Sequence, residues 1–161
     1  MKYEGRVSDS PFLLMKPGYL KLLLNIYPPY LGAGIRVQHI SEDYREVIVS
    51  MKLRWYNRNY VGTHFGGSLV SMTDPFFMLM LMNILGKEYV VWDQAARIKF
   101  IRPGRGRVVA RFHLSQKQID EIHIQTQSGA VFRPKYEVEI VDEEGQVVAQ
   151  VVKQEYIRKK A

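Results

Sequence analysis

Two features of the stretch from Asn57 to Gly86 could take part in chemistry: the glycine pair Gly66-Gly67 and the single carboxylate of Asp74. The first backbone N–H groups of a helix have no partner within the helix and lie at its positive end. Glycines at such a position would let a ligand carbonyl or phosphate come close, and the N–H groups can hold a developing oxyanion. Tight packing of the two glycines against a neighbouring strand is an equally good interpretation.

Asp74 is a lone acid within a run of Met, Leu and Phe, where burial of an unpaired charge is costly. It follows Gly67 by seven residues, which is two helical turns along the same face. A carboxylate in a partly desolvated cleft can act as a general base or as a nucleophile. Alternatively, Asp74 caps a break in the helix at Pro75. Asn59 can donate hydrogen bonds to a ligand or hold a water, or it is simply a turn residue.

Other catalytic chemistries find little support in the sequence. The chain has no cysteine, which excludes a thiolate nucleophile and a disulfide framework. The segment Gly66-Gly67-Ser68-Leu69-Val70 does not match the elbow motif of serine hydrolases. The four histidines are scattered without the spacing of metal ligands. We therefore expect neither a metal nor a cofactor.

The composition is that of one ordinary globular domain. The 161 residues are 47% hydrophobic and 24% charged, and we expect a single domain over residues 1–161. A net charge of +7 favours an anionic partner. Residues 1–10 lack the apolar core of a secretory signal, and the apolar run 69–85 is short for a membrane span and interrupted by polar residues. We expect a buried core helix, no membrane span and a cytoplasmic protein.

The hydrophobic pattern predicts an α+β fold. A helix is expected at about 16–28, ended by Pro28-Pro29, with a membrane-surface anchor as its less favoured role. Alternating runs predict strands near 35–39, 47–53, 89–101, 108–114, 136–140 and 147–151, and Ala96, Ile98 and Phe100 share one face. A long central helix is expected at about 66–86, and a capping box predicts a short surface helix within 115–128, with a strand as the alternative. About six antiparallel strands would wrap around the central helix.

The residues Asn59, Gly66-Gly67 and Asp74 resemble the signature of hotdog-fold acyl-CoA thioesterases, in particular the phenylacetate-pathway branch. In that branch an Asn, a His-Gly-Gly and a helix Asp recur at these spacings. The order of helices and strands agrees over nearly the whole chain. The resemblance implies the hotdog fold, an antiparallel sheet wrapped around a long helix. It also implies a homodimer or a homotetramer built from dimers, with each site shared between two subunits.

The resemblance implies a role for each matching residue. Asp74 would be the general base or the nucleophile, the Gly67 N–H would polarise the thioester carbonyl, and Asn59 would position the water or the thioester. The chain departs from the family pattern at Phe65, which stands where the family has its histidine. His64 lies one position earlier and is included among the candidate catalytic residues.

Further residues are expected to bind the substrate. Basic residues cluster along one predicted strand and the following turn, and arginine suits the phosphates of coenzyme A. A solvated strand face is the alternative. Nucleic acid is a poorer partner, because exposed aromatic residues are not interleaved with the basic cluster. The predicted substrate-binding residues are Thr63, Phe65, Gly66, Arg102, Arg105 and Arg107.

The sequence therefore predicts a hydrolase of an acyl-CoA or a related acyl thioester. Phe76, Phe77 and Met78 of the central helix would line an acyl or aryl pocket, although core packing suits most of such side chains. The alternative is a non-catalytic hotdog module that binds acyl-CoA or serves a structural role, and Phe65 is its best support. A dehydratase of the same fold would need a histidine where Phe65 stands.

Overall fold

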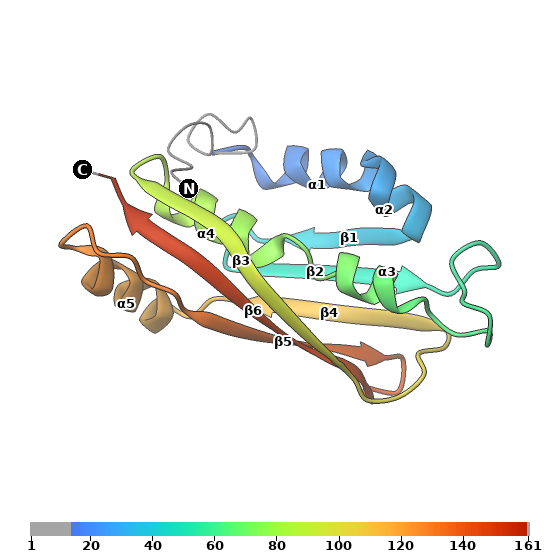
Figure 1. Cartoon of the computed structure of the whole chain (residues 1–161). Helices are drawn as coiled ribbons and strands as arrows, with labels where there is room; N and C mark the ends of the chain where they lie inside the picture. The colour runs from blue at the N-terminus through green and yellow to red at the C-terminus, as the bar shows by residue number, and fades with distance from the viewer. Residues whose placement is uncertain (1–13, 161) are drawn as a thin grey trace.

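A computed structural model describes residues 14–160 of the chain (Figure 1). The helices and strands follow one another in the predicted order. They are α1 (Pro17–Ile26), α2 (Pro28–Ala33), β1 (Ile35–Ile40), β2 (Glu46–Lys52), α3 (Gly66–Ser71), α4 (Phe76–Leu85), β3 (Tyr89–Phe100), β4 (Arg107–His113), α5 (Gln116–Thr126), β5 (Lys135–Asp142) and β6 (Val147–Lys159).

The six strands form one sheet in the order β1-β2-β4-β5-β6-β3, and every neighbouring pair is antiparallel. This confirms the predicted six-stranded antiparallel sheet. Long twisted strands allow the sheet to curve, and Figure 1 shows it wrapping around α3 and α4. β1 and β3 are the two edge strands, and β3 runs its whole length beside β6.

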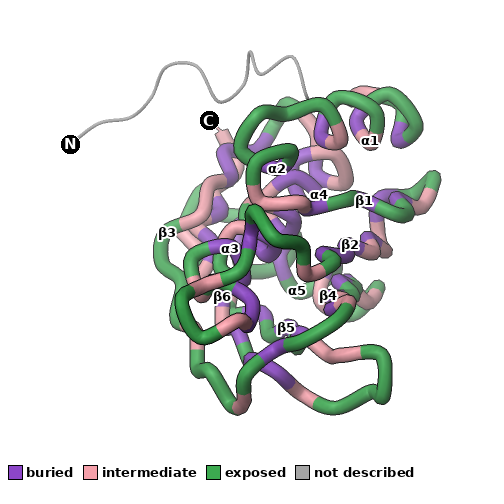
Figure 2. The backbone as a smooth tube through the Cα atoms, turned by 90° about the vertical axis from the view of Figure 1, so that its right-hand side faces the viewer, coloured by how far each residue is buried: buried purple, intermediate pink, exposed green. Residues whose placement is uncertain are grey.

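The core lies between α4 and the concave face of the sheet, where Figure 2 shows the buried segments gathered. Phe76 and Phe77 are both buried, and their rings lie 5.0 and 5.2 Å from the ring of Phe112 on β4. Phe77 also stacks on Tyr136 of β5 at 5.1 Å. The segment Gly66–Leu85 is long and apolar enough to cross a bilayer, but most of it is buried inside the protein. It is the core helix of this fold.

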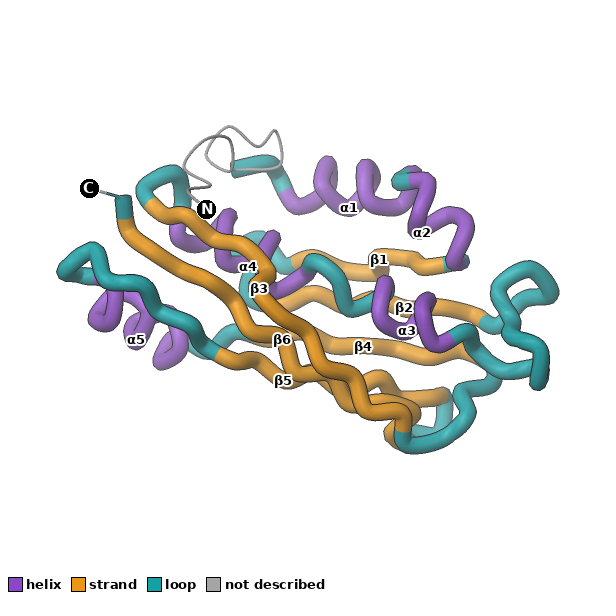
Figure 3. Tube along the Cα trace, viewed as in Figure 1, coloured by secondary structure: helices purple, strands orange, loops and turns teal. Residues whose placement is uncertain are grey.

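The central helix is interrupted, as Figure 3 shows between α3 and α4. A proline inside a helix removes a hydrogen bond and clashes with the preceding turn, so the chain leaves the helix at residues 72–75 and starts again at Phe76. Asp74 consequently lies in the break. The prediction that Asp74 shares a helical face with Gly67 is wrong in this respect.

The first helix also differs from the expectation at about 16–28. α1 ends at Ile26, and Pro28-Pro29 then open a second helix, α2. Proline suits the first turn of a helix, because its fixed φ is helical and its missing N–H has no partner to lose. The two prolines both stop one helix and begin the next.

Two other segments test the strand and helix predictions. Ser115 and Gln118 form the reciprocal capping box at the start of α5, whose Ile119 and Ile122 are buried, so the predicted short helix is confirmed. By contrast, the second half of β3 does not bury the face carrying Ala96 and Phe100, which are both exposed. Within the part of the chain that the structure describes, β3 pairs only with β6.

Candidate active site

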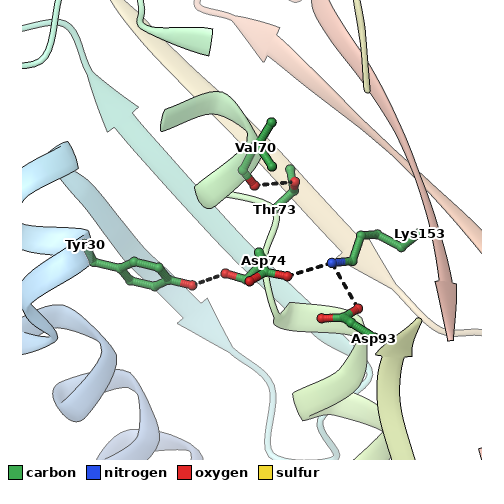
Figure 4. Close-up of polar contacts among 6 residues, drawn as sticks. All are labelled: Tyr30, Val70, Thr73, Asp74, Asp93 and Lys153. Atoms are coloured by element: carbon green, nitrogen blue, oxygen red, sulfur yellow. Dashed lines mark hydrogen bonds and ion pairs between the residues drawn. The ribbon is translucent and has the colours of Figure 1, made fainter. Parts of the chain in front are cut away.

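Asp74 is held from two sides in the break between α3 and α4. The hydroxyl of Tyr30 on α2 donates to the Asp74 backbone carbonyl, and Lys153 of β6 donates from Nζ to Asp74 Oδ1 at 2.7 Å (Figure 4). The Asp74 side chain is nevertheless 56% exposed. A carboxylate that is oriented by a buried cation and still open to solvent can meet a ligand.

Lys153 is 3% exposed and also lies 3.0 Å from Asp93 Oδ1 on β3. Burial alone would lower the pKa of Lys153, but the hydrogen bond to Asp74 and the charge of Asp93 outweigh it and hold this pKa above its ordinary value. The ammonium group is therefore charged at neutral pH. Figure 4 shows Lys153 between the two carboxylates.

A third carboxyl group completes this cluster. Glu155 is fully buried on β6 and is paired in register with Asp93 of β3. Burial, with a further contribution from Asp93, raises the pKa of Glu155 to about 9. Burial also raises the pKa of Asp93, against the lowering effect of Glu155 and Lys153. Glu155 is therefore protonated at neutral pH, which reduces the negative charge beside Asp93 and Asp74.

Lys153, Asp93, Glu155 and Tyr30 are not among the site residues predicted from the sequence. The alternating pattern of β6 could have identified two of them. Lys153 and Glu155 occupy the same buried face of β6 as Val151 and Ile157. Charged residues in the buried phase of a strand are uncommon unless they are paired.

Asn59 forms the framework of the loop before α3. Its amide nitrogen donates to Thr63 Oγ1 at 2.9 Å and to the carbonyl of His64 at 3.3 Å. Its Oδ1 accepts from the backbone N–H groups of Val61 and Thr63 at 3.1 and 3.0 Å. These contacts favour the turn interpretation of Asn59.

His64 is buried and joins this loop to the turn between β3 and β4. Its Nε2 lies 3.1 Å from the carbonyl of Gly106, and its backbone N–H donates to Gly104 at 3.0 Å. Burial lowers the pKa of His64, while the Gly106 contact opposes this effect. The imidazole is therefore neutral at pH 7. Within residues 14–160, Nδ1 has no hydrogen-bond partner.

Gly66 and Gly67 open α3, and each is covered by an aromatic ring. A Cβ added at Gly66 would lie 3.1 Å from the ring of Phe100, and one added at Gly67 would lie 2.5 Å from the ring of Phe65. The predicted packing against a neighbouring strand therefore holds for Gly66, which faces Phe100 of β3, whereas Gly67 faces Phe65 at the start of its own helix. Phe65 is 56% exposed, so its ring can move aside from Gly67.

The structure brings several predicted site residues together in one depression of about 430 Å³. Its lining includes Asn59, Thr63, His64, Gly66 and Arg102. Phe65 lines a broader depression next to it, with Trp55, Arg58 and Tyr60. Asp74 lines neither of them.

The predicted arginines are divided among different surroundings. Arg102 forms a 2.7 Å ion pair with Asp142 of β5. Arg107 belongs to a small depression of about 240 Å³ with Arg36, Lys52 and Arg54, and Arg105 is exposed. Among residues 14–160 no group of three or more His, Asp or Glu side chains is arranged to hold a metal ion.

Residues 19–157 match the family described as a domain of unknown function, DUF4442. The chain belongs to this family. No curated protein matches the DUF4442 chain significantly in sequence.

Solved structures similar to this DUF4442 protein have the hotdog fold of thioesterases. A protein of unknown function from Pseudomonas aeruginosa, named a probable thioesterase, has a TM-score of 0.79 at 17% identity, covering 92% of this chain and 99% of its own. A thioesterase from Haemophilus influenzae has a TM-score of 0.65 at 16% identity, with coverages of 91% and 96%. At these identities the similarity shows the fold alone.

A third similar structure is a mutant of the phenylacetic acid degradation protein PaaI from Thermus thermophilus. It is 25% identical, has a TM-score of 0.54, and the match covers 80% of the DUF4442 chain and 97% of PaaI. The predicted fold class and the resemblance to hotdog thioesterases are both confirmed.

Proposed function

We propose that this protein hydrolyses the thioester bond of an acyl-CoA, with Asp74 as the catalytic carboxylate. The observation that carries the proposal is the Asp74 side chain, which is 56% exposed while Lys153 fixes one of its oxygens at 2.7 Å. The similarity to thioesterases supports hydrolysis of a small-molecule thioester. The sequence resemblance supports coenzyme A as the carrier, and the net charge of +7 suits an anionic ligand.

The proposed reaction needs a nucleophile and a site for the developing oxyanion. Asp74 either removes a proton from an attacking water or attacks the carbonyl itself, and the Gly67 N–H holds the oxyanion. The tetrahedral intermediate then releases the thiolate of coenzyme A and, directly or after hydrolysis of an acyl-enzyme anhydride, the carboxylic acid.

Asn59 and His64 have supporting roles in this proposal. Their polar groups hold the loop in the conformation that presents Thr63, Phe65 and Gly66 to a ligand. Arg102, Arg105 and Arg107 are proposed contacts for the phosphates of coenzyme A. Since Asp74 lies outside the depression lined by Asn59 and His64, we propose that a dimer completes the site, with Asp74 of one subunit serving the loop of the other.

A non-catalytic acyl-CoA-binding module is the second candidate function. The observation that favours it is the ring of Phe65, which lies against Gly67, the residue proposed to hold the thioester carbonyl. Such a protein would bind coenzyme A thioesters without turning them over.

The test compares hydrolysis of acyl-CoA substrates of several chain lengths by the wild type and by Asp74→Ala and Asp74→Asn. Both variants are expected to lose at least about 100-fold in kcat, the range assigned to a general base. Asp120→Asn, at an exposed acid of α5, serves as the control and should retain full activity. Undiminished turnover by Asp74→Ala would exclude Asp74 as the catalytic carboxylate. Binding of coenzyme A thioesters without turnover by the wild type would exclude the enzyme proposal and favour the module.

A further inference from the structure

An apolar cavity of about 590 Å³ lies between the first two helices and the start of α4. α1 contributes Leu23 and Ile26, Tyr27 stands at the joint with α2, and Pro75, Met78 and Leu79 form the opposite wall. The volume falls within the range of about 300–1,000 Å³ that is typical of small-molecule sites.

The lining of this cavity selects for a hydrocarbon. Among residues 14–160, all of the side chains that line it are aliphatic, aromatic or thioether groups, and none is charged. Of its two phenols, Tyr30 already donates its hydroxyl to the backbone carbonyl of Asp74. Burial and the Asp74 charge raise the pKa of Tyr30, so that it stays a donor. The cavity therefore offers little to a phosphate or a nucleotide and much to an alkyl chain.

The cavity reaches the backbone of the residue that carries the proposed catalytic carboxylate. Pro75 in its wall is the residue next to Asp74, and Tyr30 is hydrogen-bonded to the backbone carbonyl of Asp74. Figure 4 shows Tyr30 reaching Asp74 from the side opposite Lys153. A chain lying in the cavity would direct its polar end toward the Asp74 region.

The mouth of the cavity leaves apolar surface uncovered. Leu23, Ile26 and Tyr27 are 38%, 57% and 49% exposed, and Figure 2 shows much of α1 and α2 exposed. Contiguous apolar surface of this kind commonly marks a ligand or partner site.

Met78 is half-buried and lies on the cavity side of α4, whereas Phe76 and Phe77 are core residues. Of the three residues predicted to line an acyl pocket, only Met78 lines this cavity.

We infer that this cavity binds the hydrocarbon tail of a fatty acyl group, which makes medium- and long-chain acyl thioesters the substrate class. The substrate assignment rests on the proposed function, whereas binding of the tail does not. Each methylene buried should tighten binding about fourfold, the factor that corresponds to about 0.8 kcal/mol.

The test measures binding of octanoate, decanoate and dodecanoate to the full-length protein by titration calorimetry. The wild type should bind dodecanoate most tightly, and the affinity should rise about fourfold for each added methylene. Leu23→Trp and Met78→Trp should fill the cavity and weaken dodecanoate binding at least tenfold. Leu22→Trp places the same side chain on the neighbouring exposed position, outside the cavity lining, and should bind as the wild type does.

Equal dodecanoate binding by the wild type, Leu23→Trp and Met78→Trp would overturn the inference. The inference would also be overturned if the wild type bound no dodecanoate and sedimentation showed that Leu23→Trp abolishes self-association. A second copy of the chain would then cover the cavity. Acyl-CoA turnover separates this result from the proposed function. Binding of the hydrocarbon tail without any acyl-CoA turnover would support the tail-binding cavity and reject the hydrolase proposal. Acyl-CoA turnover that is unchanged in Leu23→Trp and in Met78→Trp would support the hydrolase proposal and reject the tail-binding cavity.

Discussion

At the scale of single residues, the candidate site contains a cation that is almost fully removed from water. Lys153 is 3% exposed and is neutralised by Asp74 and Asp93, at 2.7 and 3.0 Å. A buried ion pair is worth little compared with a hydrophobic replacement, but removing one partner leaves the others unpaired. The same lysine therefore serves stability and fixes the orientation of the Asp74 carboxylate.

Replacement of Lys153 by Met should therefore affect both properties. We expect a loss of about 3 kcal/mol in the free energy of unfolding, the lower end of the range for breaking a buried pair, because Asp74 can turn to solvent. Acyl-CoA turnover should also fall, since Asp74 loses the contact that orients it. Denaturant unfolding and steady-state kinetics measure the two effects. The control is Lys159→Met, also on β6, which removes a surface ion pair at 3.8 Å and should change the free energy of unfolding by less than about 1 kcal/mol. A similar loss of stability in both variants would show that burial of Lys153 does not matter.

Glu155 should make stability depend on pH. Its folded-state pKa of about 9 exceeds the unfolded value of 4.5, so the native state binds more protons than the unfolded state between these limits. Stability should therefore fall as pH rises from 7 to 9, with a slope of at most about 1.4 kcal/mol per pH unit for one proton. Glu155→Gln should flatten this slope. Denaturant midpoints measured at several pH values provide the check, and an unchanged slope in the variant would show that Glu155 is ionised in the folded protein.

The residues of this cluster were only partly accessible from the sequence. Asp74 attracted attention because a lone acid stands out in an apolar run. Lys153 and Glu155 stand in the inward phase of β6, but nothing in the sequence says that β6 lies beside β3, which brings Asp93 to them. The cluster of Asp93, Lys153 and Glu155 forms because β3 pairs with β6. Alternation of apolar and polar residues predicts a strand but does not predict its partner strand.

At the scale of elements, local signals in the sequence predicted two features. Pro75 predicted the break in the central helix, and the capping box of Ser115 and Gln118 predicted α5.

The start of α3 is instead shaped by two aromatic rings. The rings of Phe65 and Phe100 over Gly67 and Gly66 were not predictable, since Phe100 arrives from β3. Both glycines consequently pack against an aromatic ring, whatever else they do.

A double-mutant cycle tests this packing. In the wild-type background Gly67→Ala should destabilise, because the new Cβ would lie 2.5 Å from the Phe65 ring and the ring must shift. In the Phe65→Ala background the same change should be neutral or stabilising by up to about 1 kcal/mol, the ordinary preference of a helix for Ala over Gly. The two backgrounds should therefore differ by a coupling energy of about 0.5 kcal/mol or more, read from denaturant unfolding. Additive effects would mean that the ring does not restrict Gly67.

At the scale of the whole molecule, the order of elements followed from the sequence but the order of strands did not. Each hairpin could be predicted from two alternating runs and a short turn, as for β1 and β2. β3 instead takes the sheet edge next to β6, although β4 follows it in the chain. Its second half carries Ala96, Arg97, Lys99 and Phe100 in exposed positions, where the alternating pattern alone would place one face inward. An edge strand whose sequence pattern predicts a buried face, but whose residues are exposed, is suited to pair with a strand of another chain.

Pairing of β3 with a second copy would extend the sheet and bring two Asp74-containing regions into one assembly. Ala96→Lys should be harmless in an isolated subunit, because surface changes usually stay within about 0.5 kcal/mol. In a dimer joined at β3 the two added charges would lie at the interface on one face of the sheet, where like charges repel, so the dimer should dissociate and acyl-CoA turnover should fall with it. Analytical ultracentrifugation over a range of protein concentrations, together with kinetics, measures both. Ala130→Lys adds the same charge at an exposed site outside the strands and should leave the dimer intact. An Ala96→Lys variant that dimerises as well as the wild type would show that the β3 edge is not the interface. A wild type that stays monomeric and active would show in addition that the Asp74 site is complete within one chain.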